Sequence, residues 1–204
     1  DAFMENGTTI MDPETVFFSW DTSIEKDVVI GANIVFGKNV SIESDVTVNS
    51  FCSIENSIIK QGASIGPFSR LRNGAEIGQD SKIGNFVEVK NSSLKEGVKA
   101  SHLSYIGDAE IDENANIGAG TITCNYDGVD KHKTTIGKRA FIGSNSSLIA
   151  PLNIGDDANI AAGSSISKDV ESGSLAITRA PIKFISNWSK KLRKNNNEEE
   201  KCVE

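Results

Sequence analysis

The sequence is poor in aromatic residues and has no long apolar run. Phe, Trp and Tyr together make up 6% of its 204 residues. No apolar stretch approaches the roughly 20 residues that a membrane-spanning helix needs, and no signal peptide opens the chain. We therefore expect no membrane span. The chain opens at Asp1 rather than at Met, which is compatible with a piece of a longer protein.

Cysteine and basic charge are also scarce. The three cysteines, Cys52, Cys124 and Cys202, are far apart and odd in number, so they show neither a disulfide framework nor CxxC metal spacing. This usage is typical of a reducing compartment, and we expect a cytoplasmic protein. The formal net charge is −7, whereas proteins that bind nucleic acid normally present a basic surface. We expect no nucleic-acid partner.

What the sequence does contain is a six-residue repeat. Aliphatic or aromatic lead residues recur mostly every six positions, with one eleven-residue step, two five-residue steps and one longer insertion. The leads are Phe18, Ile24, Ile30, Phe36, Ile42, Val48, Ile54, Ile65, Leu71, Ile77, Ile83, Val89, Leu94, Ala100, Ile106, Ile111, Ile117, Ile136, Ile142, Leu148, Ile154, Ile160 and Ile166. The fourth residue after a lead is usually small or β-branched, and glycine often follows the lead directly.

A period of six does not fit an α-helix, which would distribute the leads around its surface. In an extended chain, a lead and the residue four places later point to the same side. We therefore predict an all-β fold, a parallel β-helix of hexapeptide repeats over residues 18–170, after a lead-in at residues 1–17. We expect residues 171–194 to cap the last coil or to pack on a partner, and residues 195–204 to be disordered.

This repeat resembles that of the left-handed β-helix acyltransferases, in which three hexads form one triangular coil. The left hand is taken from the resemblance, because the period alone does not determine it. If three hexads close a coil, equivalent residues three hexads apart lie about 4.8 Å apart. Arg72 and Lys90 then lie one above the other, and two cations so close are unfavourable unless an anion lies between them.

Residues 99–135 hold both histidines, both tyrosines and Cys124, and they differ from the monotonous repeat around them. The same register places His102 on the outer surface, below a column of small residues (Ala119, Ser144 and Ala162) that leaves a groove for a ligand. Residues 123–135 break the period, so we expect them to form an extruded loop, which is a common place for function.

Four strings make the resemblance specific: GPFSRLRNGAEIG (66–78), IGNFVEVKNS (83–92), KASHLSYIGDAEI (99–111) and NIGAGTITCNYDG (116–128). They are similar to the acetyltransferase domain of the bacterial bifunctional N-acetylglucosamine-1-phosphate uridyltransferase/glucosamine-1-phosphate N-acetyltransferase, and the likeness runs from about residue 6 to 188. The nucleotidyltransferase domain of that family has no counterpart here, so we expect uridyl transfer to be absent from this chain.

The resemblance implies transfer of acetyl from acetyl-coenzyme A to the amine of glucosamine 1-phosphate. The product, N-acetylglucosamine 1-phosphate, is a precursor of UDP-N-acetylglucosamine and of the cell envelope. The resemblance also implies that no metal is required and that the protein forms a homotrimer whose sites are shared between protomers.

The resemblance assigns a role to each matching position. His102 matches the catalytic base, a task suited to imidazole because the substrate amine must lose a proton before it attacks a thioester. Sugar-phosphate-binding positions are Arg72, Lys90, Tyr105, Asn116 and Lys131. Acetyl-coenzyme A positions are Ala119, Asn125, Tyr126, Ser144, Ala162 and Arg179.

Some alternatives stay open. Glu88 would orient the substrate, polarise His102 or be a surface carboxylate, and His132 is a solvated loop residue or has a role in substrate binding. A metal-dependent lyase on this scaffold would need three histidine ligands, and the chain has two. A structural solenoid would show flat Thr arrays and no loop. The remaining rival is an acyltransferase acting on another amino sugar or on serine.

Overall fold

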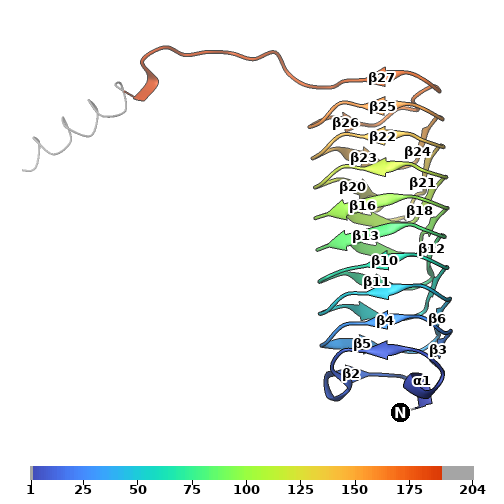
Figure 1. Ribbon diagram of the computed structural model, residues 1–204. Helices are drawn as coiled ribbons and strands as arrows, with labels where there is room; N and C mark the ends of the chain where they lie inside the picture. The colour runs from blue at the N-terminus through green and yellow to red at the C-terminus, as the bar shows by residue number, and fades with distance from the viewer. Residues whose placement is uncertain (1, 190–204) are drawn as a thin grey trace, which may run out of the picture.

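The computed structural model describes residues 2–189, which form a parallel β-solenoid with three walls (Figure 1). We call the walls A, B and C in the order in which each coil passes through them. All strand pairs between coils are parallel, and each strand pairs with the strands of the same wall in the coils before and after it. This confirms the predicted parallel β-helix, and the hexapeptide spacing fits the left hand.

Wall A has ten strands: β1 (Thr9–Ile10), β4 (Val29–Ile30), β7 (Thr47–Val48), β10 (Ser64–Ile65), β13 (Lys82–Asn85), β16 (Lys99–His102), β19 (Asn116–Ile117), β22 (Phe141–Ile142), β25 (Asn159–Ile160) and β27 (Leu175–Ala176). Wall B has nine: β2 (Val16–Phe17), β5 (Ile34–Phe36), β8 (Ser53–Ile54), β11 (Arg70–Arg72), β14 (Glu88–Lys90), β17 (Tyr105–Gly107), β20 (Ile122–Cys124), β23 (Ser147–Ile149) and β26 (Ser165–Ile166).

Wall C has eight strands: β3 (Ser23–Ile24), β6 (Val40–Ile42), β9 (Ser57–Ile59), β12 (Ala75–Ile77), β15 (Ser93–Leu94), β18 (Ala109–Ile111), β21 (Thr134–Ile136) and β24 (Leu152–Ile154). A short helix, α1 (Ala2–Glu5), and a 3₁₀ turn, η1 (Pro13–Thr15), lie at the amino-terminal end. No helix within residues 2–189 has the length and apolarity to cross a membrane.

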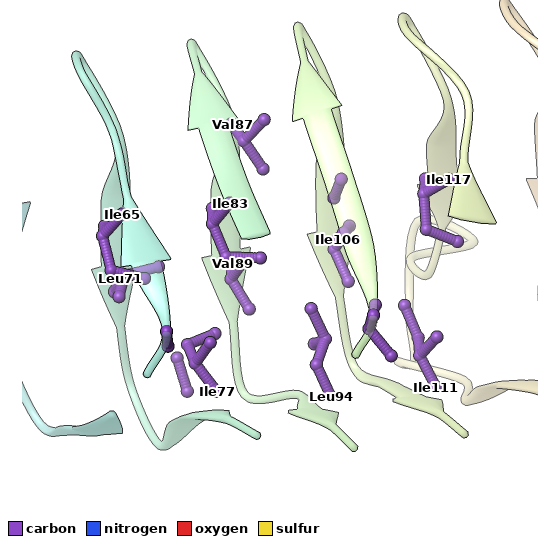
Figure 2. Close-up of a cluster of buried hydrophobic side chains, with 14 of the residues drawn as sticks. Ile65, Leu71, Ile77, Ile83, Val87, Val89, Leu94, Ile106, Ile111 and Ile117 are labelled. Carbon is purple, nitrogen blue, oxygen red and sulfur yellow. The ribbon is translucent and has the colours of Figure 1, made fainter. Parts of the chain in front are cut away.

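The lead residues form one continuous core inside the coils. Ile65, Leu71, Ile77, Ile83 and Val89 are all fully buried, and Figure 2 shows how they stack with the leads of neighbouring coils. Burying one such side chain contributes about 1.5–3 kcal/mol. Because every coil adds three of them, the repeat supplies a core even though no coil could fold alone.

The corners between walls need a left-handed backbone, which Asn, Asp and Gly adopt most readily. Most corners follow this rule, but the corner between walls A and B carries Phe51, Phe68, Phe86 and Leu103 at positive φ. All four side chains are exposed. The three phenyl rings are stacked, with centroids 4.9 and 5.2 Å apart.

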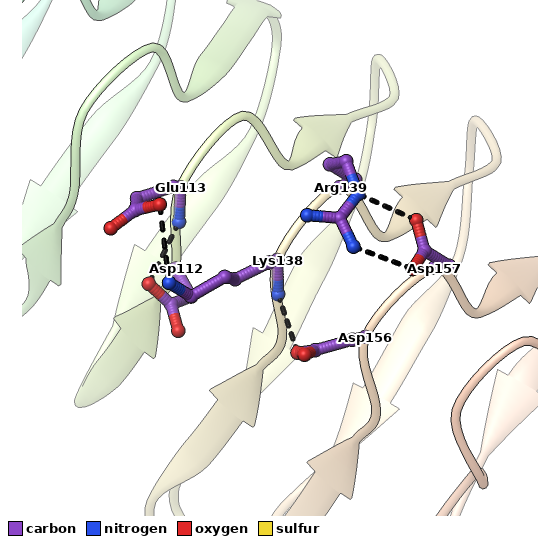
Figure 3. A network of polar contacts seen from close by, with 6 residues as sticks. All are labelled: Asp112, Glu113, Lys138, Arg139, Asp156 and Asp157. Carbon is purple, nitrogen blue, oxygen red and sulfur yellow. Dashed lines mark hydrogen bonds and ion pairs between the residues drawn. The ribbon is translucent and has the colours of Figure 1, made fainter.

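The corner between walls C and A is held by charge instead (Figure 3). Arg139 donates two hydrogen bonds to Asp157 of the next coil, from Nε and Nη2 at 2.8 and 2.7 Å. The Lys138 backbone N–H donates to Asp156 at 2.8 Å. The hydrogen bond from Arg139 lowers the pKa of the Asp157 carboxyl.

The structure differs from the predicted repeat in four respects. The first coil begins before Phe18, since β1 and β2 already pair with β4 and β5. The last coil continues past Val170 to β27, which pairs with β25. The eleven-residue step contains a further lead, Ile59, which is fully buried in β9. The extruded loop is residues 125–133, because β20 and β21 keep Thr123 and Thr135 in the coil.

Thr178 and Arg179 still contact the last coil, and beyond them the chain leaves it as an arm that runs away from the solenoid (Figure 1). Ile182, Phe184 and Trp188 on this arm are exposed. Residues 171–176 close the last coil through β27, and Thr178 bonds to Ser165 of β26, whereas the arm beyond Arg179 runs away from the coil. The rest of the expected capping segment, residues 190–194, and the expected disordered tail, residues 195–204, lie outside the described residues.

Candidate active site

The two predicted cations lie side by side on the outer face of wall B. Arg72 in β11 is the direct register partner of Lys90 in β14, as predicted. An anion offsets their repulsion, because Arg72 Nε donates to Glu88 Oε1 at 2.6 Å and both side chains are partly buried. Among the described residues, no hydrogen bond joins Glu88 to His102, and the partner of Glu88 is Arg72.

His102 is the last residue of β16 and lies at the corner between walls A and B. Its Nδ1 is 2.7 Å from Oδ1 of Asn85, its register partner in the preceding coil. The amide oxygen can only accept, so this contact places the imidazole proton on Nδ1 and leaves the Nε2 lone pair available. The ring is exposed, and the arrangement suits a general base.

The predicted column of small residues continues from His102 along this corner. Gly120 N donates to the His102 carbonyl at 3.4 Å, Asn145 N to that of Ala119 at 2.8 Å, and Gly163 N to that of Ser144 at 2.8 Å. These bonds put His102, Ala119, Ser144 and Ala162 in equivalent positions of successive coils. At roughly 4.8 Å per coil, the column is roughly 14 Å long.

Arg179 lies at the far end of this column. A methyl group added to Gly163 would meet Arg179 Cδ at 3.9 Å. The preceding residue, Thr178, is fixed to the last wall B strand, because Ser165 N donates to its hydroxyl at 2.7 Å. The column therefore has a base at one end and an exposed guanidinium at the other, which suits a long anionic ligand.

Tyr105 links the histidine corner to the cations. It follows that corner directly in β17, and its register partner in the preceding coil is Glu88. Its ring lies across Gly107, since a methyl group at Gly107 would overlap the Tyr105 hydroxyl and ring. Gly107 is in turn the register partner of Lys90, so the phenol reaches toward the cation pair.

The loop starts at the corner between walls B and C. Asn125 is buried and donates through Nδ2 to Asp108, which also accepts from Nδ2 of Asn91. Partial burial opposes ionisation of Asp108, but these two hydrogen bonds, with Lys90 and Lys131 nearby, hold the pKa of its carboxyl below the usual value. Asp108 therefore stays a carboxylate at neutral pH and ties the loop to the coil.

The loop itself is closed by local contacts. Tyr126 and Lys131 form an antiparallel bridge, and Asp127 accepts from the N–H groups of Val129 and Asp130 at 2.8 Å. His132 Nε2 is 2.7 Å from Asp127 Oδ2. This pairing is the first cause of a strongly lowered pKa of Asp127. His132 thus has a hydrogen-bonded partner within the loop.

A groove of about 550 Å³ runs beside the loop on the wall C side. Lys131 and His132 line it together with Asn91, Asp108 and Glu110, whereas His102 does not. Lys133 at its edge pairs with Glu110. The groove therefore carries charges of both signs, with Lys131 and Lys133 beside Asp108 and Glu110.

A single chain therefore arranges the predicted site residues in separate places. One group lies on the A/B corner, a second lies on wall B, and a third is in the loop at the B/C corner. Asn116 begins β19 at the opposite end of wall A. The group on the A/B corner is His102, Ala119, Ser144 and Ala162 with Arg179. The group on wall B is Arg72, Lys90 and Tyr105, and the group in the loop is Asn125, Tyr126 and Lys131.

The sequence alone missed three supporting residues. Asn85 occupies the His102 position one coil earlier, so the register could have found it. Asp108 and Thr123 gave no such signal, because their roles depend on where the loop leaves the coil. Within residues 2–189, no group of three or more His, Cys, Asp or Glu residues is placed to hold a metal ion.

Two family models match parts of the chain. The bacterial transferase hexapeptide (six repeats) matches residues 56–91, and the hexapeptide repeat of succinyl-transferase matches residues 133–168. Both matches are to hexapeptide repeats, in agreement with the three-walled solenoid.

Curated relatives cover nearly the whole chain. It is 50% identical over 193 residues to the bifunctional protein GlmU of Paramagnetospirillum magneticum, which is 95% of this chain and 43% of that protein. It is 52% identical over 190 residues to GlmU of Zymomonas mobilis, covering 93% of this chain and 42% of that protein. The chain thus spans less than half the length of these relatives, which agrees with its resemblance to one domain of a bifunctional enzyme.

Solved structures support the fold. The UDP-N-acetylglucosamine acyltransferase of Francisella novicida aligns with a TM-score of 0.60 at 21% identity, over 92% of this chain and 73% of that one. At this identity the likeness concerns the β-solenoid alone.

Proposed function

We propose that this chain transfers acetyl from acetyl-coenzyme A to the amine of glucosamine 1-phosphate, giving N-acetylglucosamine 1-phosphate and coenzyme A. The observation that carries the proposal is the position of His102, with a free Nε2, between the column that ends at Arg179 and the cation-bearing face of wall B. The identity to GlmU and the four matching strings support the acceptor.

In this mechanism, the cations Arg72 and Lys90 hold the sugar phosphate while Tyr105 lies against the sugar. Acetyl-coenzyme A lies along the column and places its thioester near Ala119. His102 Nε2 takes a proton from the amine as the nitrogen attacks the thioester carbonyl. A backbone N–H near Ala119 donates to the developing oxyanion, which collapses and expels the thiolate of coenzyme A.

The proposal is tested by thiol release from acetyl-coenzyme A with three acceptors: glucosamine 1-phosphate, a UDP-amino sugar and serine. We expect turnover to be fastest with glucosamine 1-phosphate. Faster turnover with either of the other acceptors would reassign the chain to a different acyltransferase on the same fold. Thiol release that does not depend on any acceptor would overturn acetyl transfer to an amine.

Replacing Lys90 with alanine is expected to raise KM for glucosamine 1-phosphate about 10- to 100-fold, the effect of losing one hydrogen bond to a charged group. The control is Lys60→Ala, whose ion pair with Glu43 lies at another corner, two to three coils before Lys90, and should not affect KM. With glucosamine, which lacks the phosphate, Lys90→Ala and the wild type should differ little. An equal loss with both acceptors would mean that Lys90 does not bind the phosphate.

We also propose that the chain assembles as a homotrimer in which sites are shared between protomers. The loop, the column and Asn116 lie on different faces of one chain, and the exposed arm with Phe184 and Trp188 presents apolar surface that a neighbour could bury. Sedimentation velocity should give three times the mass of the 21.8 kDa chain. Trp188→Ser is expected to shift the protein toward smaller species, and a monomeric wild type would contradict the assembly.

A further inference from the structure

Thr123 is a polar residue in a position that other coils fill with aliphatic side chains. It occupies the inward slot of wall B, where the register aligns it with Leu148 in the next coil and, through the pair Tyr105–Ile122, with Ile106 in the preceding coil. Its side chain is 1% exposed. A hydroxyl in such a place is costly unless it is hydrogen-bonded.

The hydroxyl takes the place of one backbone hydrogen bond between neighbouring strands of wall B. In the regular coils, the N–H after a buried wall B lead donates to the next coil's carbonyl, as Glu55 N does to Leu71 O at 2.9 Å. The corresponding N–H of Gly107 donates instead to Thr123 Oγ1 at 2.8 Å, and that hydroxyl donates back to the Gly107 carbonyl at 3.0 Å.

The Thr123 carbonyl is thereby released for another partner. Asn125 N donates to it at 3.0 Å, a tight turn that takes the chain out of the coil where the loop begins. Because the Thr123 hydroxyl replaces the Thr123 carbonyl as the acceptor for Gly107, β17 and β20 stay hydrogen-bonded while the backbone after Thr123 turns into the loop. On the other side of the same bonds, the Gly107 peptide lies under the Tyr105 ring.

We propose that Thr123 is a positioning residue that fixes Tyr105 on the acceptor side and Asn125 with Tyr126 on the cofactor side through one buried hydroxyl. The roles of these three residues rest on the proposed function. The placement of the Gly107 peptide and of the loop by Thr123 does not depend on the proposed function, and hydrogen exchange measures it separately.

The chain offers a matched control at the other end of the loop. Thr134 is also fully buried, in β21, and its hydroxyl has no hydrogen-bond partner within residues 2–189. Thr123→Val and Thr134→Val both replace a buried hydroxyl with a methyl group of similar size. Only the first removes a hydrogen bond, and Thr123→Ser should keep it.

The experiment combines hydrogen exchange of the full chain with acetyl-transfer kinetics. Thr123→Val is expected to speed amide exchange in peptides covering residues 105–109 and 125–133 at least tenfold. It should also raise KM for both substrates about tenfold, as expected for one lost buried hydrogen bond, with kcat within about threefold. Thr123→Ser and Thr134→Val should match the wild type in both measurements.

The outcomes separate the two proposals. If Thr123→Val behaves as Thr134→Val does in exchange and in KM, Thr123 is not a positioning residue. Faster exchange in a chain whose wild type shows no acetyl transfer would retain the positioning of the loop and overturn the proposed function. Should Thr123→Val fail to fold, Thr123→Cys decides: its weaker acceptor should give intermediate exchange and KM, and wild-type values would contradict the inference.

Discussion

Replacing His102 with alanine is expected to lower acetyl transfer to glucosamine 1-phosphate by about 10²-fold or more, the usual contribution of a positioned general base. The imidazole keeps a lone pair on Nε2, because Asn85 holds its proton on the other nitrogen. The fall should appear in kcat, measured as thiol release at saturating concentrations of both substrates, because neither substrate loses a binding contact.

The second histidine of the chain provides the control. His132 pairs with Asp127 inside the loop, so His132→Ala should leave kcat within about threefold of the wild type. If His102→Ala keeps wild-type kcat, the reaction stands but the base lies elsewhere, and Glu88 is the next residue to replace. If His132→Ala loses as much activity as His102→Ala, the loss of kcat does not single out His102 as the base.

Replacing Gly84 with alanine is expected to destabilise the coil that carries the base, at the upper end of the roughly 1–3 kcal/mol typical of overpacking. A Cβ at Gly84 would overlap the backbone carbonyl of Ser101 in the next coil. Because both atoms belong to or attach directly to the backbone, no side-chain rotation relieves the overlap, and β13 and β16 must separate.

Urea unfolding measures this effect, with Lys82→Ala as the control on the same strand. Lys82 is exposed at the outer face of β13, so its loss should change the free energy of unfolding by less than about 0.5 kcal/mol. Acetyl transfer should fall in Gly84→Ala as well, since Asn85 pairs with His102 between these two strands. A change in unfolding free energy no larger than that of Lys82→Ala would contradict the close packing.

The hexapeptide pattern predicted most of the fold because lead spacing and register obey the same geometry. Once Arg72 and Lys90 are three hexads apart, their contact follows, and so does the column that starts at His102. Ile59 was missed because a five-residue and a six-residue step together look like a gap when only sixes are sought.

The remaining features depend on interactions that a period does not contain. The loop was placed two residues too wide at each end because Thr123 breaks the aliphatic pattern while staying in the coil through its hydroxyl. The contact of Glu88 with Arg72 needs side-chain direction as well as register, since their positions along the strand differ by two residues. How the separate groups of site residues meet remains a proposal about the assembly.

The stacking of coils also sets how this protein can change in length. Each coil bonds only to the coils directly before and after it, so the distance from His102 to Arg179 is fixed by counting coils and not by the shape of a cavity. Adding or deleting one whole coil would move one end of the column by roughly 4.8 Å and leave every remaining coil intact. The distance between the base and the guanidinium can therefore change only in whole coils, while the residues that each remaining coil presents to the ligand stay the same.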